Sequence, residues 1–435
     1  MLMGNKICYL YEVLEYRAKT MGDDLYIITS NKTITYSEMW KYSLAIAKRI
    51  MRDAGREPIT LNCKDNINSI ITFWASTING NDLYIIHTEN NHFIIDDTYI
   101  NESIANEENI QNFQISTRRD FSIYINSSGT TNRPHLIENT EEQFVESLNS
   151  IKRYKPMDYI NNRTDVYIST GISHSYGLSA VVEHTLSGCR LYIPDDFNIL
   201  CQFKFLYKFK TQIKAIIATP FLVKTLFQLL PQFDLKNLKY IVVGTDMIPF
   251  HLVKQILDKN PEIIVYCRYG LSELPSIISV LPISKENLDI ISPQLISTHL
   301  DIYKLKHESK ETFNELLIID KHNNIIRTGD NVSINNGEYI LQGRCSNIFK
   351  YHGYKINPHL IEKQLLAIKC ISECVLFSEN DKLILKVKLN KDISSVDILN
   401  FWKLNISIEY LPDQIIFVEE IIKTVTGKTI RHMYP

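Results

Sequence analysis

A run of small polar residues early in the chain has the composition of a phosphate-binding loop. Residues 127–131 read Ser-Ser-Gly-Thr-Thr and follow an apolar stretch that is expected to be a strand. Their hydroxyls and open backbone N–H groups are suited to phosphate oxygens, and Arg133 adds a positive charge nearby. The same composition is common in polar surface turns. Taken alone, the segment fits a surface turn better than a ligand site.

A second segment offers an aromatic ring and a carboxylate. Tyr269, Gly270, Ser272 and Glu273 come directly after a predicted strand, and open α/β sheets bind ligands at the carboxyl ends of their strands. There Tyr269 could stack on a nucleotide base and Glu273 could bind Mg²⁺. A single glutamate on a loop is more often only solvated, so this segment alone does not establish a metal site.

Three more segments lie further along the chain. The aspartate of Arg327–Asp330 follows a glycine turn, and its carboxylate could accept two hydrogen bonds from a ribose diol, although the segment is equally good turn chemistry. Gly343–Ile356 combines glycines with cationic side chains and fits either a hinge or an exposed hairpin. Thr424–Arg431 contains Gly427-Lys428, which by itself fits a solvated turn.

The elements that would position these segments alternate along most of the chain. Short apolar stretches predict strands, and the amphipathic stretches between them predict helices. This alternation is typical of parallel sheets that are buried on both faces. The predicted strands are Leu83–Ile86, Asp165–Ser169, Arg190–Ile193, Ala215–Ala218, Tyr240–Val243 and Ile263–Cys267, and the predicted helices include Phe221–Leu230 and His251–Lys259.

The pattern changes near Gly343. A helix over Pro358–Ile368 is predicted next, and Asn357 before Pro358 is a favourable helix start. A second helix and three strands follow. The predicted strands are Cys374–Phe377, Leu383–Leu389 and Gln414–Val418. The last ninety or so residues are therefore expected to form a small α+β domain, although this pattern does not fix its boundary.

Composition limits the classes of protein to which the chain can belong. The 435 residues are 45% hydrophobic and 22% charged, with a net charge of −2. A strongly basic field for nucleic acid or a membrane surface is therefore excluded. The eight cysteines lack zinc-site spacing and are expected to be reduced, mostly buried thiols. Without a signal-peptide pattern or a long apolar span, the chain is expected to be cytoplasmic, with no nucleic-acid or membrane partner.

The order and spacing of the five segments resemble the adenylate-forming superfamily, which includes acyl-CoA synthetases, carrier-loading adenylation domains and luciferases. The likeness extends from Thr35-Tyr36-Ser37-Glu38 to Lys428. It implies an α/β fold with a large N-terminal domain of layered sheets and helices, residues 1–345, and a small mobile α+β lid, residues 346–435. It also implies that ATP and Mg²⁺ activate a carboxylic acid as its acyl-adenylate. The acyl group would then pass to the thiol of CoA or of a separate acyl or peptidyl carrier protein.

The resemblance assigns a role to individual residues. Lys428 would reach the reacting carboxylate and the α-phosphate, and Glu273 would bind Mg²⁺. Ser346 would be the hinge, and Gly353 would let the thiol arm pass beside the backbone. The ATP-binding positions would be Ser127, Ser128, Gly129, Thr130, Thr131, Gly244, Thr245, Tyr269, Gly270, Ser272, Asp330 and Arg344, with the last two holding the ribose. The acid-binding positions would be His174, Tyr176, Gly177 and Gly244.

Several positions depart from the family pattern. Asn132 stands where glycine is usual, and His135-Leu136 stands where a Lys-Gly pair is usual. Asparagine tolerates left-handed backbone geometry better than most residues, and Arg133 could replace part of the lost charge. Gly244-Thr245 replaces the paired glycines of many members, and Ser346 replaces a common aspartate. These changes bear on rate and pocket shape more than on fold.

The segment around His174 bears on the identity of the acid. Gly171–Leu178 resembles the His-x-x-Gly-Leu segment of acyl- and aryl-CoA synthetases. His174 stands about where amino-acid-activating members carry an aspartate, and imidazole cannot pair with an ammonium group, so an acid without an α-amine is favoured. His174 could instead be a core histidine bound to a backbone carbonyl. A free-standing amino-acid adenylation domain and a non-catalytic relative that binds an acid or a carrier stay open as alternatives.

Overall fold

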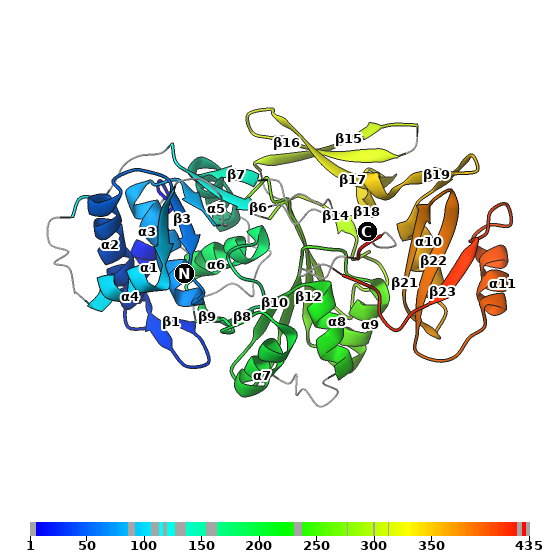
Figure 1. Ribbon diagram of the computed structural model, residues 1–435, viewed down its shortest axis with the longest axis horizontal. Helices are drawn as coiled ribbons and strands as arrows, with labels where there is room; N and C mark the ends of the chain where they lie inside the picture. The colour runs from blue at the N-terminus through cyan, green and yellow to red at the C-terminus, as the bar shows by residue number, and fades with distance from the viewer. Residues whose placement is uncertain are drawn as a thin grey trace. The chain divides into compact units, whose positions relative to one another are not determined.

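The computed structural model is a mixed α/β protein with several sheets (Figure 1). It describes residues 6–85, 92–105, 113–115, 120–126, 136–153, 163–229, 237–275, 277–298, 301–311, 313–423 and 429–431. Packing divides the chain into two compact units. The first comprises residues 1–291 and 299–302, and the second comprises residues 292–298 and 303–435. The predicted fold class, with a small sheet domain at the C-terminal end, is confirmed; the predicted domain boundary at Ser346 stays a prediction.

The first unit contains an eight-stranded sheet with the order β13-β12-β11-β10-β8-β9-β1-β2. Its six central strands run parallel, while β13 and β2 pair antiparallel at the two edges. The strands are β1 Leu25–Ile28, β2 Thr33–Thr35, β8 Asp165–Ile168, β9 Arg190–Tyr192, β10 Ala215–Ala218, β11 Tyr240–Val243, β12 Ile264–Tyr269 and β13 Ser279–Ile283.

Continuous burial explains why the central strands could be predicted. Every residue of β8 and of β10 is buried, as expected for parallel strands covered on both faces. The helices that connect the strands are α6 Ser175–Ser187, α7 Ile199–Phe209, α8 Pro220–Leu229 and α9 Phe250–Lys259. The predicted helices begin one residue later than the observed α8 and α9. The predicted end of α9 at Lys259 is confirmed, and Leu230, the predicted end of α8, lies outside the described residues. The predicted alternation of strands and helices in a parallel sheet is therefore confirmed.

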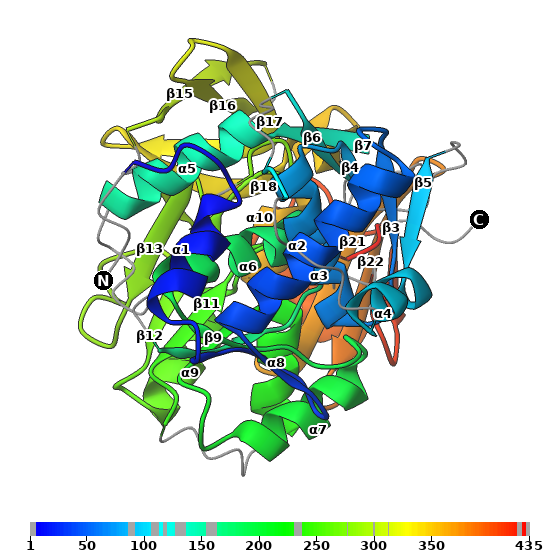
Figure 2. The same cartoon turned by 90° about the vertical axis from the view of Figure 1, so that its left-hand side faces the viewer.

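A second sheet in the same unit has five strands in the order β5-β3-β4-β6-β7. Helix α3 lies beside β3 and packs on α2 (Figure 2). Thr35 and Glu38 form a capping box at the start of α2, and Asp65 caps α3. The strands are β3 Ile59–Asn62, β4 Leu83–Tyr84, β5 Phe93–Asp96, β6 Ser122–Asn126 and β7 Leu136–Thr140; the helices are α1 Glu12–Thr20, α2 Tyr36–Asp53, α3 Asn66–Asn79, α4 Asp97–Ala105 and α5 Glu141–Arg153.

The second unit begins with a five-stranded antiparallel sheet that sequence patterns did not predict. Its order is β14-β18-β17-β16-β15. The strands are β14 Leu295–Ile296, β15 Tyr303–Ser309, β16 Asn314–Asp320, β17 Ile325–Asn335 and β18 Glu338–Arg344. In β15 six of the seven residues are at least partly exposed. The strand therefore lacks the continuous apolar stretch by which the parallel strands were recognised.

The rest of the second unit has a hydrophobic core of its own, which includes Leu376, Leu385 and Trp402. Sheet β21-β22-β23 supplies part of it, together with the two helices of this region. The elements are the 3-10 turn Cys345–Asn347, β19 Phe349–Tyr351, β20 Tyr354–Ile356, α10 Pro358–Leu365, β21 Ile371–Glu379, β22 Lys382–Leu389, α11 Ser395–Asn405 and β23 Gln414–Phe417.

Helix α10 begins as predicted and ends earlier. The Asn357 side chain accepts a hydrogen bond from the His359 N–H, and Pro358 occupies the first turn. The predicted helix continued to Ile368. Instead, the N–H groups of Ala367 and Ile368 donate to carbonyls three residues earlier, so the chain tightens into 3-10 geometry after Leu365.

None of the eight cysteines, all of which lie in the described part of the chain, forms a disulfide. Cys189 and Cys267 are buried, whereas Cys8 is exposed and the other five are partly exposed, so burial is less complete than predicted. No helix in the described part of the chain combines the length and the apolar character that a membrane crossing requires.

Candidate functional site

Three candidate segments follow strands that lie close together in the parallel sheet. Residues 169–177 follow β8, residues 244–245 follow β11, and residues 270–273 follow β12. Because these strands are parallel and their order is β12-β11-β10-β8, the three segments emerge on the same side of the sheet, where the carboxyl ends of the strands lie. This side is called the sheet edge below. The structure therefore brings together candidate residues that are about a hundred positions apart in the sequence.

The turn between β8 and α6 is closed by a tight backbone contact at Gly177. A Cβ atom at this position would lie 2.2 Å from the Gly171 carbonyl oxygen and 2.3 Å from that of Thr170. Hydrogen bonds support the same turn: the His174 N–H donates to Gly171 O at 3.1 Å, and the Leu178 N–H donates to His174 O at 2.9 Å. The first turn of α6 can therefore lie against this loop only because Gly177 has no side chain.

Tyr176 and Gly244, both predicted to bind the acid, are in direct contact. A Cβ atom on Gly244 would lie 2.5 Å from the Tyr176 ring, and the Tyr176 hydroxyl donates to the Val242 carbonyl at 3.1 Å. Burial raises the pKa of Tyr176, so its phenol stays protonated at neutral pH. The Tyr176 side chain is thus fixed against the end of β11 through both its ring atoms and its hydroxyl.

Thr245 holds a backbone conformation that favours glycine. Its φ is 75°, in the left-handed region where a β-branched residue is strained. Its buried Oγ1 atom has no hydrogen-bond partner among the described residues. A glycine at this position, as in many members of the family, would have no such strain. The departure from the family pattern therefore places a threonine hydroxyl without a described hydrogen-bond partner at the sheet edge.

The segment after β12 is connected to the start of α6. The Ser175 and Ser272 hydroxyls lie 3.1 Å apart, and the Asn139 side-chain amide donates to the Ser272 carbonyl at 3.1 Å. Tyr269 is the last residue of β12 and is partly buried, while Glu273 is exposed in the turn that follows. An exposed carboxylate at a sheet edge fits Mg²⁺, which takes one or two protein carboxylates and completes its shell with phosphate and water.

A buried ion pair lies beneath this region, and sequence reasoning did not find it. Arg268 Nη2 is 2.9 Å from Glu183 Oε2, and the two side chains are 5% and 2% exposed. The Arg268 guanidinium carbon also lies 5.4 Å from the centre of the Tyr176 ring. Strand β12 and helix α6 are therefore joined below the residues that form the sheet edge. The two charges are 85 positions apart, so no local pattern could reveal the pair.

Among the described residues of the first unit, His184 is a histidine buried in the core. Its Nδ1 atom lies 2.6 Å from the Ala180 carbonyl oxygen, and burial lowers the pKa of the ring to about 3. A core histidine bound to a backbone carbonyl was one interpretation of His174. His174 itself lies partly buried at the N-cap of α6, and its role stays a prediction.

Asp330 and Arg344, both predicted to hold the ribose, are in contact within the second unit. They face each other across β17 and β18, and Arg344 Nη1 is 2.9 Å from Asp330 Oδ1. Asp330 is 5% exposed, whereas 55% of the Arg344 side chain is exposed. The Thr328 hydroxyl accepts from the Asp330 N–H at 3.0 Å and Gly329 has φ 67°. These residues lie within strand β17, at a register shift in its pairing with β16, so the predicted glycine turn is instead an irregularity inside a strand. A carboxylate oriented by an arginine is suited to accept hydrogen bonds from a diol.

Residues 343–356 were predicted to form either a hinge or an exposed hairpin, and part of the segment forms a hairpin. Strands β19 and β20 pair around His352 and Gly353, whose φ values of 47° and 85° match a two-residue type I′ turn. The turn itself explains the glycine, so Gly353 alone does not indicate a thiol passage. Ser346 is exposed in the 3-10 turn that separates β18 from β19. Its hinge role stays a prediction.

Some predicted residues lie outside the described part of the chain. They are the phosphate loop with its two departures from the family pattern, and the tail lysine. The positions are Ser127, Ser128, Gly129, Thr130, Thr131, Asn132, Arg133, His135 and Lys428.

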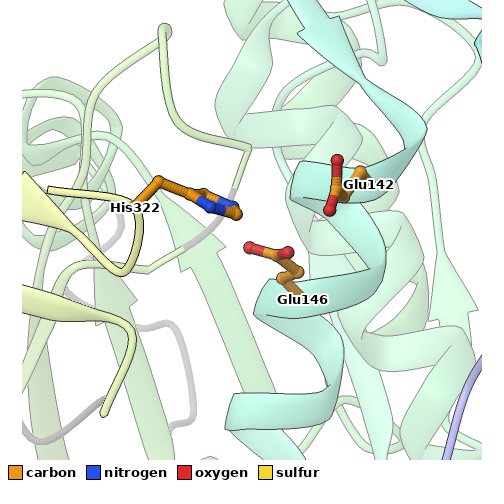
Figure 3. Close-up of side chains that lie close together, drawn as sticks. All are labelled: Glu142, Glu146 and His322. Carbon is orange, nitrogen blue, oxygen red and sulfur yellow. The ribbon is translucent and has the colours of Figure 1, made fainter. Parts of the chain in front are cut away.

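Two further carboxylates lie on helix α5. Figure 3 shows Glu142 and Glu146 one turn apart on this helix, the first exposed and the second partly buried. His322, drawn in the same figure, belongs to the turn between β16 and β17 of the second unit, where its N–H donates to Asp320 Oδ1 at 2.9 Å. We assign no ligand to these residues, which belong to different units.

Comparison with known sequences identifies related enzymes. The family model described as "AMP-binding enzyme" matches residues 83–310, just over half of the chain. A 4-coumarate–CoA ligase from Pinus taeda is 22% identical over 340 residues, which cover 70% of this chain and 63% of that protein. A D-alanine–D-alanyl carrier protein ligase from Staphylococcus haemolyticus is 24% identical over 196 residues, 40% of each chain. The matches thus span less than two thirds of these relatives.

Comparison with solved structures supports the fold over nearly the whole chain. An o-succinylbenzoate CoA synthetase from Bacillus subtilis, in complex with its acyl-adenylate intermediate, aligns with a TM-score of 0.77 at 17% identity and covers 96% of both chains. An anthranilate CoA ligase in complex with anthranoyl-AMP aligns with a TM-score of 0.83 at 14% identity, covering 98% of this chain and 96% of the other. At such identities the likeness establishes the fold.

Proposed function

Because this chain belongs to the AMP-binding enzyme family, within the adenylate-forming superfamily, we propose that it activates a carboxylic acid with ATP. The products of the first step are an acyl-AMP and pyrophosphate. In the second step a pantetheine thiol attacks the acyl carbon, and AMP leaves. The acid is an aryl or acyl acid without an α-amine, and the thiol belongs to CoA or to a separate carrier protein. A cytoplasmic location, where ATP and reduced thiols are available, is part of this proposal.

The observation that carries the proposal is the meeting of three candidate segments at one edge of the parallel sheet. Tyr176 packs on Gly244, and Ser175 lies against Ser272, although these residues come from three different strand-to-helix or strand-to-turn connections. All four lie within the residues that match the family model. Ligands of open α/β sheets bind at such an edge, and the Tyr176 ring offers a flat, apolar wall for an acyl or aryl group.

The first step has an electrostatic difficulty that the proposed residues address. A carboxylate is a weak nucleophile and must approach a triphosphate that is also negatively charged. Mg²⁺ bound at Glu273 would neutralise charge on the phosphates and on the leaving pyrophosphate. Lys428 would add a positive charge between the carboxylate and the α-phosphate. The carboxylate of Asp330, oriented by Arg344, would hold the ribose, so that the two reactants stay in line.

The choice of acid rests on residues near Tyr176. The partly buried His174 offers no negative charge to a substrate ammonium group, which supports an acid without an α-amine. The relatives that are coumarate, o-succinylbenzoate and anthranilate CoA ligases also favour an aryl acid. The likeness to D-alanine ligases keeps activation of an amino acid as a second candidate.

Pyrophosphate exchange with Mg-ATP tests the first step. The purified chain is incubated with labelled pyrophosphate and a panel of aryl, aliphatic, hydroxy and amino acids. We expect label to enter ATP only when an aryl or acyl acid is present. Exchange driven by an amino acid alone would replace the leading proposal with the second candidate. Absence of exchange with every acid would favour a non-catalytic relative.

Two variants test in the same assay whether exchange depends on Lys428. Lys428→Ala should reduce exchange by about three orders of magnitude, since it removes a charge placed against the transition state. Nucleotide binding, followed by thermal shift with Mg-ATP, should change little. Lys239→Met is the matched control: this lysine pairs with Glu262 at an exposed site and should exchange at the wild-type rate. Normal exchange in Lys428→Ala would overturn the role assigned to Lys428.

A further inference from the structure

Residues 421–423 and 429–431, called the tail below, are attached to the small sheet β21-β22-β23 by contacts that the proposed chemistry does not use. The first is apolar. Ile421 is 4% exposed and packs with Val375, Phe377 and Ile384. In β21 and β22 these three residues alternate with Leu376, Leu383 and Leu385, which belong to the main core of the region. The tail therefore packs on the opposite face of the sheet from that core.

The second attachment closes the chain on itself. Lys423 and Thr429 form an antiparallel bridge, and the Ile430 N–H donates to the Ile422 carbonyl at 3.0 Å. Lys423 is also fixed to the sheet, because its Nζ lies 2.6 Å from Glu373 Oε2 and both side chains are less than 20% exposed. Residues on either side of positions 424–428 are thus held to each other and to β21.

The third attachment is a two-point ion pair. Arg431 Nη1 lies 2.5 Å from Glu362 Oε1, and Nη2 lies 2.8 Å from Glu362 Oε2. Glu362, on α10, is 7% exposed. Its Oε1 atom also accepts the Leu376 N–H at 2.7 Å, and Arg431 donates to the Leu376 carbonyl at 3.1 Å. Helix α10, strand β21 and the tail therefore meet at one bidentate contact, the geometry that arginine makes best with a carboxylate.

We propose that the Glu362–Arg431 pair is a positioning device for the acid-activating step, which holds the tail so that Lys428 is presented at the reacting groups. This inference rests on the proposed function and on the role assigned there to Lys428. Arg431 is three residues from Lys428. Thr429, which directly follows Lys428, is held by the bridge to Lys423. Restricting both ends of this short segment reduces the conformations that the lysine must give up when it reaches the transition state.

A positioning role and a purely structural role predict different kinetics. If the pair only stabilised the fold, its loss would lower the melting temperature and reduce both steps of the reaction together. If it positions Lys428, the acid-activating step alone should slow. Transfer of the acyl group from supplied acyl-AMP to the thiol should continue, since that step does not require the lysine in the proposed mechanism.

The test compares four variants of the full chain. Arg431→Met removes the guanidinium, and Glu362→Gln removes the charge while keeping an acceptor for the Leu376 N–H. Arg431→Lys keeps the charge and loses the two-point geometry. Lys239→Met is again the control at an exposed ion pair. Each variant is assayed for pyrophosphate exchange with the acid found in the panel, for thiol acylation from the corresponding acyl-AMP, and for its melting temperature.

We expect exchange to fall on the order of a hundredfold in Arg431→Met, the scale of a displacement of about 1 Å at a reacting group. Glu362→Gln should show a similar loss and Arg431→Lys a smaller one, with thiol acylation within about twofold of wild type. In the Lys428→Ala background, Arg431→Met should cause no further loss, because the arginine acts through the lysine. Equal loss of both steps, or a full additional loss in the double variant, would overturn the inference.

The same experiment separates failure of this inference from failure of the proposed function. Wild-type exchange together with normal exchange in Arg431→Met would reject the positioning role and leave the function standing. Absence of acid-dependent exchange in the wild type would reject the function itself.

Discussion

Replacing Gly177 by alanine sets two physical effects against each other. Gly177 lies in the first turn of α6, where intrinsic helix propensity favours alanine over glycine by about 0.5–1 kcal/mol. The structure predicts the opposite sign. The new Cβ would lie 2.2 and 2.3 Å from two carbonyl oxygens of the loop after β8, closer than any relaxed contact, so α6 or the loop must move. Overpacking of this kind costs about 1–3 kcal/mol, which leaves a net loss of up to roughly 2.5 kcal/mol.

The displacement should also affect the reaction, because Tyr176 is the preceding residue and its ring packs on Gly244. A shift of a few tenths of an ångström there should raise the KM for the acid on the order of tenfold. The melting temperature should fall by up to roughly 4 °C.

Gly337→Ala is the matched control for this prediction. Gly337 has φ 83° with open space around its Cβ position, so the change should cost about 1 kcal/mol in backbone strain and leave the KM unchanged. A Gly177→Ala variant that melts higher than wild type and keeps its KM would refute the close contact.

Three further changes test other parts of the first unit. Arg268→Met leaves the buried carboxylate of Glu183 without its guanidinium and should destabilise the protein by about 3–5 kcal/mol in urea denaturation; the double variant with Glu183→Gln should recover much of this loss. Thr245→Gly removes the strain of a threonine at φ 75° and should raise stability by about 1 kcal/mol, so a lower melting temperature would contradict the strain argument. Burial lowers the pKa of His184 to about 3. The unfolded chain then binds a proton at this residue below about pH 6.5 while the folded chain does not. Stability should fall, by up to about 1.4 kcal/mol per pH unit, as the pH drops from 6.5 towards 3. A His184→Asn variant should show a shallower slope in the same titration, and an unchanged slope would show that other groups control it.

The parallel sheet was the part of the fold that local patterns predicted best. The strands Ala215–Ala218 and Tyr240–Val243 have the predicted bounds. A parallel strand buried on both faces must be apolar along its whole length, and that requirement is visible within a few residues. The start of α10 was equally clear, because the capping contact of Asn357 involves only its immediate neighbours.

Sequence reasoning missed two kinds of feature. The first is a strand whose two faces carry different kinds of side chain, and the second is a contact between residues that are distant in the sequence. The antiparallel sheet β14–β18 carries exposed and charged side chains along strands such as β15, and its pairing depends on the partner strand and not on a local apolar pattern. The predicted helix over Pro358–Ile368 was too long, because the 3-10 turn at its end has no strong sequence signal. The burial of Cys63 and other thiols was overestimated for a similar reason: neighbouring apolar residues do not show how deeply a side chain lies.

By itself, the sequence determined the alternation of strands and helices, the family to which the chain belongs and the identity of the candidate residues, because these depend on residue type and order. Only the tertiary structure decided which residues meet: Tyr176 with Gly244, Arg268 with Glu183, and Arg431 with Glu362. Each of these contacts joins positions more than sixty residues apart. The free energy of such a contact depends on the distance, the burial and the orientation of two groups, and those quantities exist only once the chain has folded.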